Sequence, residues 1–192
     1  MITYCVYDSP LGAILLESDG EALTGLGFRG TVRGAEVSKI PEKGADLPVF
    51  VAARAWLDRY FRGEDPGKTP PLKVRASAFG EKVYETALQI PYGRTATYGE
   101  IAREMEEERR ASAGEERDGP GEGKSGRLSR AVGRALARNP ILLMIPCHRV
   151  TGAGGALTGY AGGLARKKAL LELEKTGRTV RGAKTACDRL LK

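Results

Sequence analysis

The chain has little cysteine and a single histidine. Among its 192 residues are three cysteines, Cys5, Cys147 and Cys187, and one histidine, His148. Cysteines so few and so far apart do not form a disulfide framework, and no CxxC or HExxH spacing is present that would bind zinc. We therefore expect no structural disulfides, no metal site and no cofactor.

Long hydrophobic runs are missing as well. No segment approaches the ~18 to 20 apolar residues that span a membrane, and the N-terminus lacks the basic-then-apolar plan of a signal peptide. The 41% of hydrophobic residues are nevertheless enough to bury a core in one domain or two small ones. These features indicate a soluble cytoplasmic or nuclear protein with no membrane partner.

Acidic residues are scarce in the last third of the chain. Residues 127–192 contain 14 Lys and Arg but only 3 Asp and Glu, whereas residues 1–76 are balanced and residues 77–126 are net acidic. A polyanion such as nucleic acid is the obvious partner for a basic segment of this kind, although a solvated basic face without a partner has the same composition.

The N-terminal part alternates β-prone runs with turn residues. The runs cover residues 3–7, 13–17 and 23–28, which predicts a meander of antiparallel strands. Helical spacing of apolar residues from Phe50 to Phe61 then predicts a helix packed on this sheet. Trp56 would lie in the core and not serve as a platform for a cofactor or a base. Three prolines and two glycines make residues 63–71 a linker.

Beyond the linker the pattern is helical. Apolar spacing predicts a helix from Phe79 to Ile90, and Thr97 and Glu100 match a capping box in front of a short helix that ends near Met105. Residues 106–126 contain almost no apolar residue besides alanine, so we expect a flexible loop that is dispensable for chemistry.

The helix that follows has two different faces. Leu128, Val132 and Leu136 lie on one face, at the spacing of an amphipathic helix. Beside that face are four arginines with no glutamate between them: Arg127, Arg130, Arg134 and Arg138. Because these charges repel one another, the pattern favours contact with phosphate groups, and a solubilising stripe is the alternative.

Cys147 follows a short apolar run and directly precedes the only histidine. A nearby imidazole can accept the proton of a thiol, so the two residues are a candidate nucleophile and base. A buried structural cysteine beside an unrelated histidine would give the same dipeptide.

Several motifs occur together in the second half of the chain. They are Ile90-Pro91-Tyr92-Gly93, Thr97-Tyr98-Gly99-Glu100-Ile101-Ala102, Arg130-Ala131-Val132-Gly133-Arg134-Ala135, Asn139-Pro140, Ile145-Pro146-Cys147-His148-Arg149-Val150 and Gly159-Tyr160-Ala161-Gly162-Gly163-Leu164. In this order and spacing they resemble the O6-alkylguanine-DNA alkyltransferases, also called methylated-DNA-protein-cysteine methyltransferases. The resemblance is strong over residues 79–105 and 127–175 and weaker over residues 1–76.

The resemblance implies a two-part fold. Residues 1–76 would form an α/β, ribonuclease-H-like domain with an antiparallel sheet plus a helix. Residues 77–176 would form a mostly α-helical DNA-binding and catalytic domain with a helix-turn-helix. Residues 177–192 lie outside the resemblance, and their composition predicts a basic C-terminal tail. The flexible insertion 106–126 falls between the two helices of that motif, where the family usually has a short turn.

The resemblance also implies the reaction and its partner. The alkyl group of O6-alkylguanine in double-stranded DNA would pass, from a nucleotide flipped out of the duplex, to Cys147. The resulting thioether is too stable for water to reverse, so each molecule would act once. We expect a cytoplasmic monomer.

Residue roles carry over in the same way. Cys147 would accept the alkyl group, His148 would act as its base through a water, and Glu174 would orient the imidazole. Asn139 would brace the turn and Tyr98 would donate a proton toward guanine N3. DNA binding is assigned to Thr97, Arg127, Arg130, Arg134 and Arg138, with Arg130 filling the place of the flipped base. The pocket is assigned to Met144, Pro146, Val150, Gly159, Tyr160 and Gly162.

Two other functions are compatible with parts of the sequence. A Cys-His hydrolase would turn over repeatedly, whereas alkyl transfer gives a burst equal to the protein concentration. A DNA-binding sensor of alkylated guanine would need no reactive cysteine, and Cys147 is present.

Overall fold

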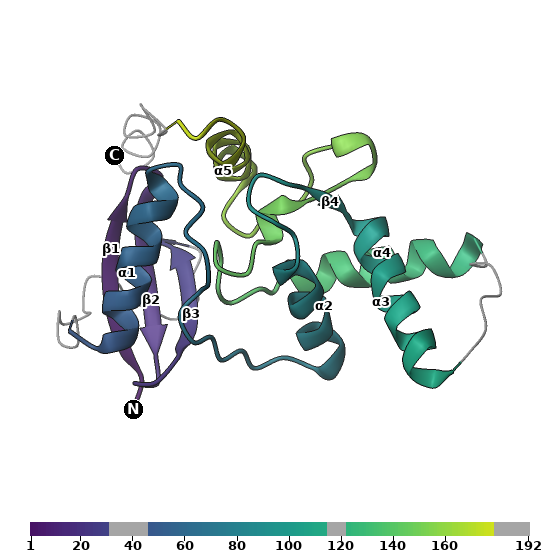
Figure 1. The fold of residues 1–192 in the computed structure, drawn as a ribbon, viewed down its shortest axis with the longest axis horizontal. Helices are drawn as coiled ribbons and strands as arrows, with labels where there is room; N and C mark the ends of the chain where they lie inside the picture. Colours follow the sequence, from purple (N-terminus) through teal and green to yellow (C-terminus); the bar gives the residue numbers. More distant parts are fainter. Residues whose placement is uncertain (31–45, 115–121, 179–192) are drawn as a thin grey trace.

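The computed structural model describes residues 1–30, 46–114 and 122–178. A three-stranded sheet lies in the N-terminal part. Figure 1 shows a helix packed on this sheet and a helical part that extends away from it. The buried residues of both parts form one hydrophobic cluster. No helix among the described residues is long and apolar enough to cross a membrane.

The sheet is the antiparallel meander that the sequence predicts. It comprises β1 (Thr3–Ser9), β2 (Gly12–Ser18) and β3 (Leu23–Phe28), in the order β1-β2-β3. The β1–β2 turn closes with Ser9 opposite Gly12, and Gly12 has a φ of 108°, which favours glycine. The three predicted strands are therefore confirmed.

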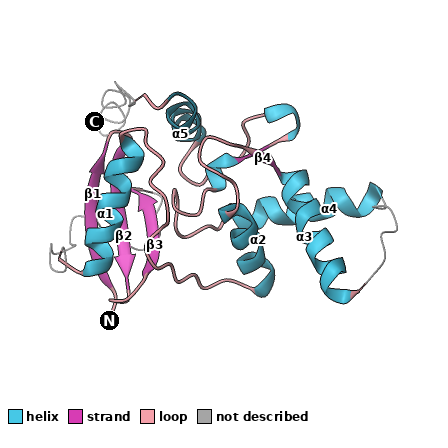
Figure 2. Ribbon diagram, in the orientation of Figure 1, coloured by secondary structure: helices cyan, strands magenta, loops and turns pink. Residues whose placement is uncertain are grey.

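Helix α1 (Pro48–Phe61) covers one face of this sheet, as the ribbon in Figure 2 shows. Its buried residues include Phe50, Trp56 and Tyr60, in the predicted helical spacing. Trp56 is 6% exposed and its indole N–H donates to the carbonyl oxygen of Gly67 in the linker, so it is a core residue as expected. Residues 62–71 contain neither helix nor strand.

The helical part begins with α2 (Ala78–Leu88), followed by the two-residue strand β4 (Ala96–Thr97) and α3 (Tyr98–Ala113). The predicted capping box is present: the Glu100 amide donates to Thr97 Oγ1 at 3.1 Å, and the Thr97 amide donates to Glu100 Oε2 at 2.6 Å. Helix α4 (Glu122–Leu136) crosses α3, and the two form the expected helix pair (Figure 1).

The loop predicted for residues 106–126 is wrong at both ends. Helix α3 continues through Ala113, where Gly114 caps it with a φ of 67°, and α4 begins at Glu122; residues 115–121 lie outside the described part. The loop was predicted because this segment contains almost no large apolar residue, but Glu, Arg and Ala all have high helix propensity. Glu106 adds ion pairs at 3.1 Å to Arg109 and to Arg110, one helical turn away. The insertion thus lengthens both helices of the motif.

The last third of the chain packs against the N-terminal sheet. After α4 come η2 (Cys147–Arg149), β5 (Val150–Thr151), η3 (Ala153–Gly155) and α5 (Leu164–Thr176), with β5 paired in parallel to β4. Before η2, the predicted apolar run 141–145 is buried, and Leu26 of β3 exchanges hydrogen bonds with Pro140 and Leu142. The segment that leads to Cys147 is therefore anchored on the edge of the sheet.

Candidate active site

Cys147 stands at the start of a tight turn and is held there by Asn139. The Asn139 side-chain nitrogen donates to the Ile145 carbonyl at 2.9 Å and to Cys147 Sγ at 3.1 Å, while its oxygen accepts from the Ile141 amide at 2.9 Å. A buried asparagine that satisfies three groups of one loop fixes the shape of that loop. The thiol is therefore placed by the loop and contacted by a polar donor.

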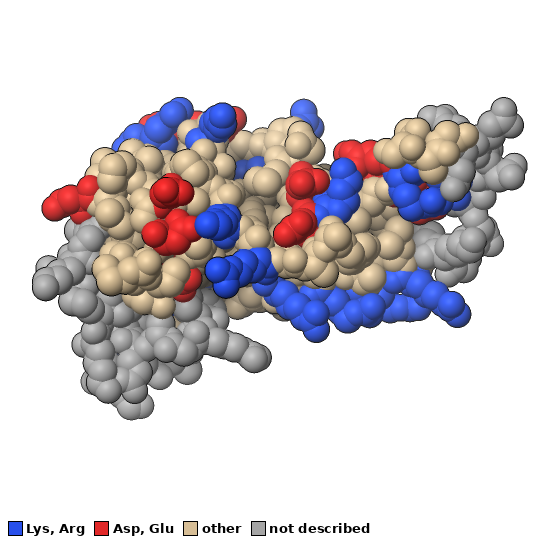
Figure 3. Space-filling model, turned by 90° about the horizontal axis from the view of Figure 1, so that it is seen from below, with Lys and Arg blue, Asp and Glu red and all other residues tan. Residues whose placement is uncertain are grey.

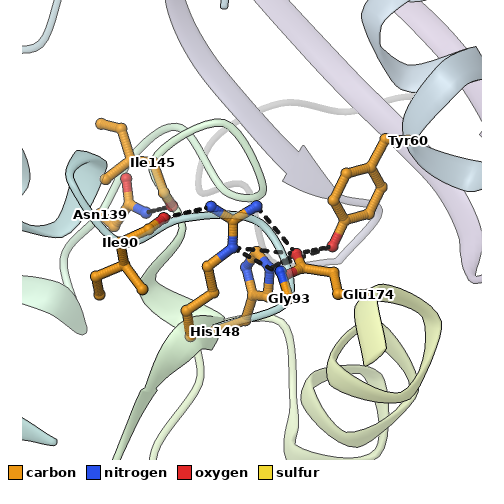
Figure 4. Close-up of polar contacts among 8 residues, drawn as sticks. Tyr60, Ile90, Gly93, Asn139, Ile145, His148 and Glu174 are labelled. Atoms are coloured by element: carbon orange, nitrogen blue, oxygen red, sulfur yellow. Dashed lines mark hydrogen bonds and ion pairs between the residues drawn. The ribbon is translucent and has the colours of Figure 1, made fainter. Parts of the chain in front are cut away.

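His148 is completely buried and faces a carboxylate. Its Nε2 lies 2.7 Å from Glu174 Oε1, whereas Nδ1 has no hydrogen-bonding partner within the described residues (Figure 4). An ionised carboxylate only accepts hydrogen bonds, so Nε2 carries the proton and Nδ1 keeps its lone pair. This assignment leaves the imidazole with a free acceptor nitrogen.

Glu174 accepts hydrogen bonds from three segments of the chain. Arg149 Nε donates to its Oε2 at 2.9 Å, the Gly93 amide donates to the same oxygen at 3.0 Å, and the Tyr60 hydroxyl donates to Oε1 at 2.7 Å (Figure 4). Burial opposes ionisation, but the hydrogen bonds from His148 and Arg149 and the charge of Arg149 hold the pKa of Glu174 well below its ordinary value. The carboxylate is therefore ionised throughout the physiological range.

The thiol and the imidazole are both neutral at rest. Burial raises the pKa of Cys147 to about 11, against the lowering effects of the Asn139 hydrogen bond and the nearby Lys167 charge. Burial also lowers the pKa of His148, although the contact with Glu174 opposes that shift. A reaction at Cys147 consequently needs a base at the moment of attack, because little thiolate is present beforehand.

A cavity of about 190 Å³ opens directly above the thiol. Its lining consists of Tyr98, Gly133, Leu136, Ala137, Cys147, Gly159, Tyr160 and Ala161. Gly159 has a φ of 33°, which favours glycine, and a Cβ there would contact the Tyr98 hydroxyl oxygen at 3.8 Å. The cavity therefore unites Tyr98, Cys147, Gly159 and Tyr160, which the resemblance assigns to one site.

The other residues assigned to the pocket lie elsewhere. Met144 and Pro146 line a second cleft with Trp56 and Arg149, and Val150 is buried in the β4–β5 pair. Gly162 packs behind Tyr160, where a Cβ would come within 2.5 Å of the Tyr160 ring. Leu143, which lines the same second cleft, has a φ of 69°, a value that is rare for a non-glycine residue.

Sequence reasoning missed Lys167 as a site residue. Its side chain is 0% exposed, and Nζ donates to the carbonyl oxygens of Val150 and Thr158 at 2.6 Å each and of Gly159 at 3.3 Å. It therefore holds the loop that carries Gly159 and Tyr160. Its helical spacing to Leu170 and Glu174 on the buried face of α5 was the available signal.

Tyr60, Arg149 and Gly93 were missed as partners of Glu174. Arg149 lay inside a motif that the sequence analysis quoted, but only the structure shows that its guanidinium faces the carboxylate. Tyr60 and Gly93 lie 114 and 81 residues from Glu174 along the chain, so no local pattern could indicate these contacts.

The predicted arginine stripe lies on the surface. Arg127, Arg130, Arg134 and Arg138 are all exposed, along α4 and the residues just after it. Figure 3 shows basic side chains gathered in a band along one edge of the helical part. Thr97, also assigned to DNA, uses its hydroxyl in the capping box at the start of α3. Among the described residues, no three His, Cys, Asp or Glu side chains are grouped as a metal site would require.

Comparison with known protein families shows which family the chain belongs to. The ribonuclease-like domain of the 6-O-methylguanine DNA methyltransferases matches residues 2–73, and the DNA binding domain of the same proteins matches residues 78–176. The chain belongs to this family. The two matched domains together cover the fold described above, with the cavity, Cys147 and Glu174 in the second.

Individual members of the family are similar over most of their length. The methylated-DNA–protein-cysteine methyltransferase of Mycobacterium leprae is 42% identical over 169 residues, which is 88% of this chain and 89% of that protein. The Haemophilus influenzae protein of the same name is 34% identical over 192 residues, 98% of this chain and 95% of its own. A crystal structure of Mycobacterium tuberculosis OGT in complex with DNA superimposes with a TM-score of 0.73 at 38% identity, covering 93% of this chain and 96% of that one.

Proposed function

We propose that Cys147 is the residue that accepts the alkyl group in this chain. Members of this family repair DNA directly, by transfer of the alkyl group of O6-alkylguanine to a cysteine. The observation that carries the proposal is the position of Cys147 in the floor of a cavity, hydrogen-bonded by Asn139 and adjacent to His148. Cys5, the other cysteine in the described residues, is buried in the sheet and contacts Arg54.

The alkyl carbon moves by displacement at a saturated centre. The Cys147 sulfur forms a bond to that carbon while the carbon–O6 bond breaks, and the electron pair of that bond stays on the guanine. His148 Nδ1 takes the thiol proton, relayed by a water, and the imidazolium that forms is stabilised by Glu174. Tyr98, on the cavity wall, supplies a proton toward guanine N3, so the base leaves neutral.

The size of the cavity fits a single base. Its volume of about 190 Å³ is below the ~300 Å³ at which pockets for drug-sized ligands begin. Its walls include the flat aromatic rings of Tyr98 and Tyr160 and two glycines, Gly133 and Gly159. The alkylated oxygen of a stacked guanine is not accessible in line with a thiol, so the nucleotide must be flipped at a cost of a few kcal/mol. Contacts from the exposed arginines of α4 to the phosphates, with Arg130 in the gap, offset this cost.

We further propose that the chain acts as a monomer, in the cytoplasm, on double-stranded DNA that contains O6-alkylguanine. The thioether formed on Cys147 has no route back to the thiol, so repair ends the activity of that molecule.

The pH dependence of repair tests the roles of the neutral thiol and imidazole. We expect the single-turnover rate on methylated duplex to be level from about pH 7 to pH 9 and to fall about tenfold per unit once His148 is protonated. Because burial lowers the pKa of His148, the midpoint of the fall should lie below its ordinary value of 6.5. Quenched-flow measurements at saturating duplex would give this profile.

The opposite profile would contradict this assignment. A rate that rises about tenfold per pH unit up to pH 10 would show that pre-formed thiolate reacts without help from His148. Repeated turnover of an ester or peptide would favour the Cys-His hydrolase instead.

A further inference from the structure

Tyr60 belongs to the helix that covers the sheet, yet its hydroxyl lies in the hydrogen-bond network of the proposed base. It donates to Glu174 Oε1 at 2.7 Å, and its oxygen lies 3.2 Å from His148 Nε2 (Figure 4). Glu174 Oε1 is also the oxygen that accepts the Nε2 proton of His148. The N-terminal part of the chain therefore contributes a residue to a network otherwise built from residues 90–174.

The hydroxyl has a fixed position. The Tyr60 side chain is 0% exposed; its ring stacks on Trp56 at 5.3 Å between centroids and packs edge-on against Phe61 and Tyr92. A phenol clamped on several sides loses little further freedom when it forms a hydrogen bond. Burial raises the pKa of Tyr60 well above its ordinary value, so the hydroxyl remains a donor at every pH at which the protein works.

The backbone is shaped to allow this contact. Tyr60 and Glu174 each stand three residues before a glycine at the end of their helix, Gly63 after α1 and Gly177 after α5. A Cβ on Gly63 would lie 2.3 Å from the Gly177 carbonyl oxygen, closer than any side chain can be. Glycine at position 63 thus permits the two helix ends to meet at the distance that the Tyr60–Glu174 hydrogen bond requires.

We propose that Tyr60 is a positioning residue for alkyl transfer: its hydroxyl holds the Glu174 carboxylate so that His148 keeps its proton on Nε2 and presents Nδ1 to the thiol. This inference rests on the proposed role of Cys147 and His148. Gly93 donates to Oε2 only, and Arg149 donates to both oxygens, to Oε2 at 2.9 Å and to Oε1 at 3.2 Å from Nε and from Nη2. The Tyr60 hydroxyl donates to Oε1 at 2.7 Å, closer than either Arg149 nitrogen, on the oxygen that faces the imidazole.

The hydrogen bond from Tyr60 also stabilises the negative charge of Glu174, which faces His148. The groups around the imidazole are Glu174 and Lys167 on α5, Arg149 and Cys147 in the turn, Tyr60 on α1 and Tyr160 on the cavity wall. Of these, only Glu174 is an anion at rest, and its charge favours the protonated imidazole. Without the Tyr60 hydroxyl the Glu174 carboxylate loses one hydrogen-bond donor and attracts a proton on the imidazole more strongly. His148 would therefore be protonated at a higher pH.

The test is the Tyr60→Phe variant, which keeps the ring and its packing but removes the hydroxyl. Single-turnover repair of methylated duplex is measured over pH 5–9 and over a range of duplex concentrations. We expect the saturated rate to fall by roughly tenfold, because the base is less well oriented. We also expect the acid limb to move to higher pH and the duplex concentration that gives half the saturated rate to stay the same.

Tyr7→Phe is the matched control. Tyr7 also donates to a carboxylate, Asp58 Oδ1 at 2.8 Å, within the same sheet-and-helix layer but away from the cavity. Its loss should leave both the saturated rate and the acid limb unchanged. Thermal unfolding of both variants reports any loss of stability.

Two results would overturn the proposal for Tyr60. One is a dependence of the saturated repair rate on pH that is the same for Tyr60→Phe as for the unmodified protein. The other is a lower melting temperature and a lower rate with the acid limb unmoved, which would mean that the hydroxyl only stabilises the fold. If the unmodified protein itself transferred no methyl group in the same assay, the proposed function would fail instead.

Discussion

Replacement of Cys147 by alanine should abolish alkyl transfer and leave recognition of DNA intact. The side chain loses its sulfur atom, and no other cysteine among the described residues lines the cavity. The exposed arginines of α4 are untouched, so the variant should still bind methylated duplex. Binding is measured by fluorescence anisotropy, and transfer by the mass of the protein after incubation.

The control for this experiment is Cys5→Ala. Cys5 is buried to 4% exposure in β1, where its sulfur accepts a hydrogen bond from Arg54 at 2.7 Å. This variant should repair at the rate of the unmodified protein once its folding is verified. A methyl group that still appears on the Cys147→Ala protein would remove Cys147 from its proposed role.

The second large effect is expected at Arg130, which we place in the gap left by the flipped nucleotide. Arg130→Ala should bind undamaged duplex nearly as well as the unmodified protein but repair methylated duplex more slowly by roughly a hundredfold. This factor corresponds to losing a few kcal/mol of support for the flipped state. Arg130→Leu or Arg130→Met should restore part of the rate, because an apolar side chain can occupy the same volume.

Arg134→Ala serves as the comparison on the same helix. Arg134 is also exposed, and a residue that only neutralises a phosphate should weaken binding to all DNA and lower the slope of log affinity against log salt by about one. A free O6-alkylguanine base needs no flipping, so Arg130→Ala should react with it at the normal rate. Equal losses on the free base and on duplex would refute the proposed insertion.

Local patterns in the sequence were sufficient for most of the fold. The strands 3–7, 13–17 and 23–28 followed from alternating β-prone runs and turn residues, and the start of α3 followed from the Thr97–Glu100 capping box. The continuation of α3 to Ala113 was missed because charged residues with high helix propensity extend it in place of apolar contacts.

The site was predictable only where its residues are neighbours or belong to a recognised motif. Cys147 and His148 were identified by their adjacency, and Asn139, Tyr98 and Glu174 by resemblance alone. Tyr60 and Lys167 depend on contacts between segments far apart in the sequence, and neither residue type signals such a role by itself. Met144 and Pro146, which the resemblance assigns to the pocket, line the second cleft and not the cavity beside Cys147, and no local pattern distinguishes the two positions.

The most direct test of the central claim is the intact mass of the unmodified protein after incubation with excess duplex that contains O6-methylguanine. Transfer of one methyl group in place of a proton adds about 14 Da. We expect this increase on every active molecule, with the modified peptide containing Cys147 and the amount of repaired guanine equal to the amount of protein. Repair that exceeds the protein concentration, or a methyl group located on Cys5, would contradict the account.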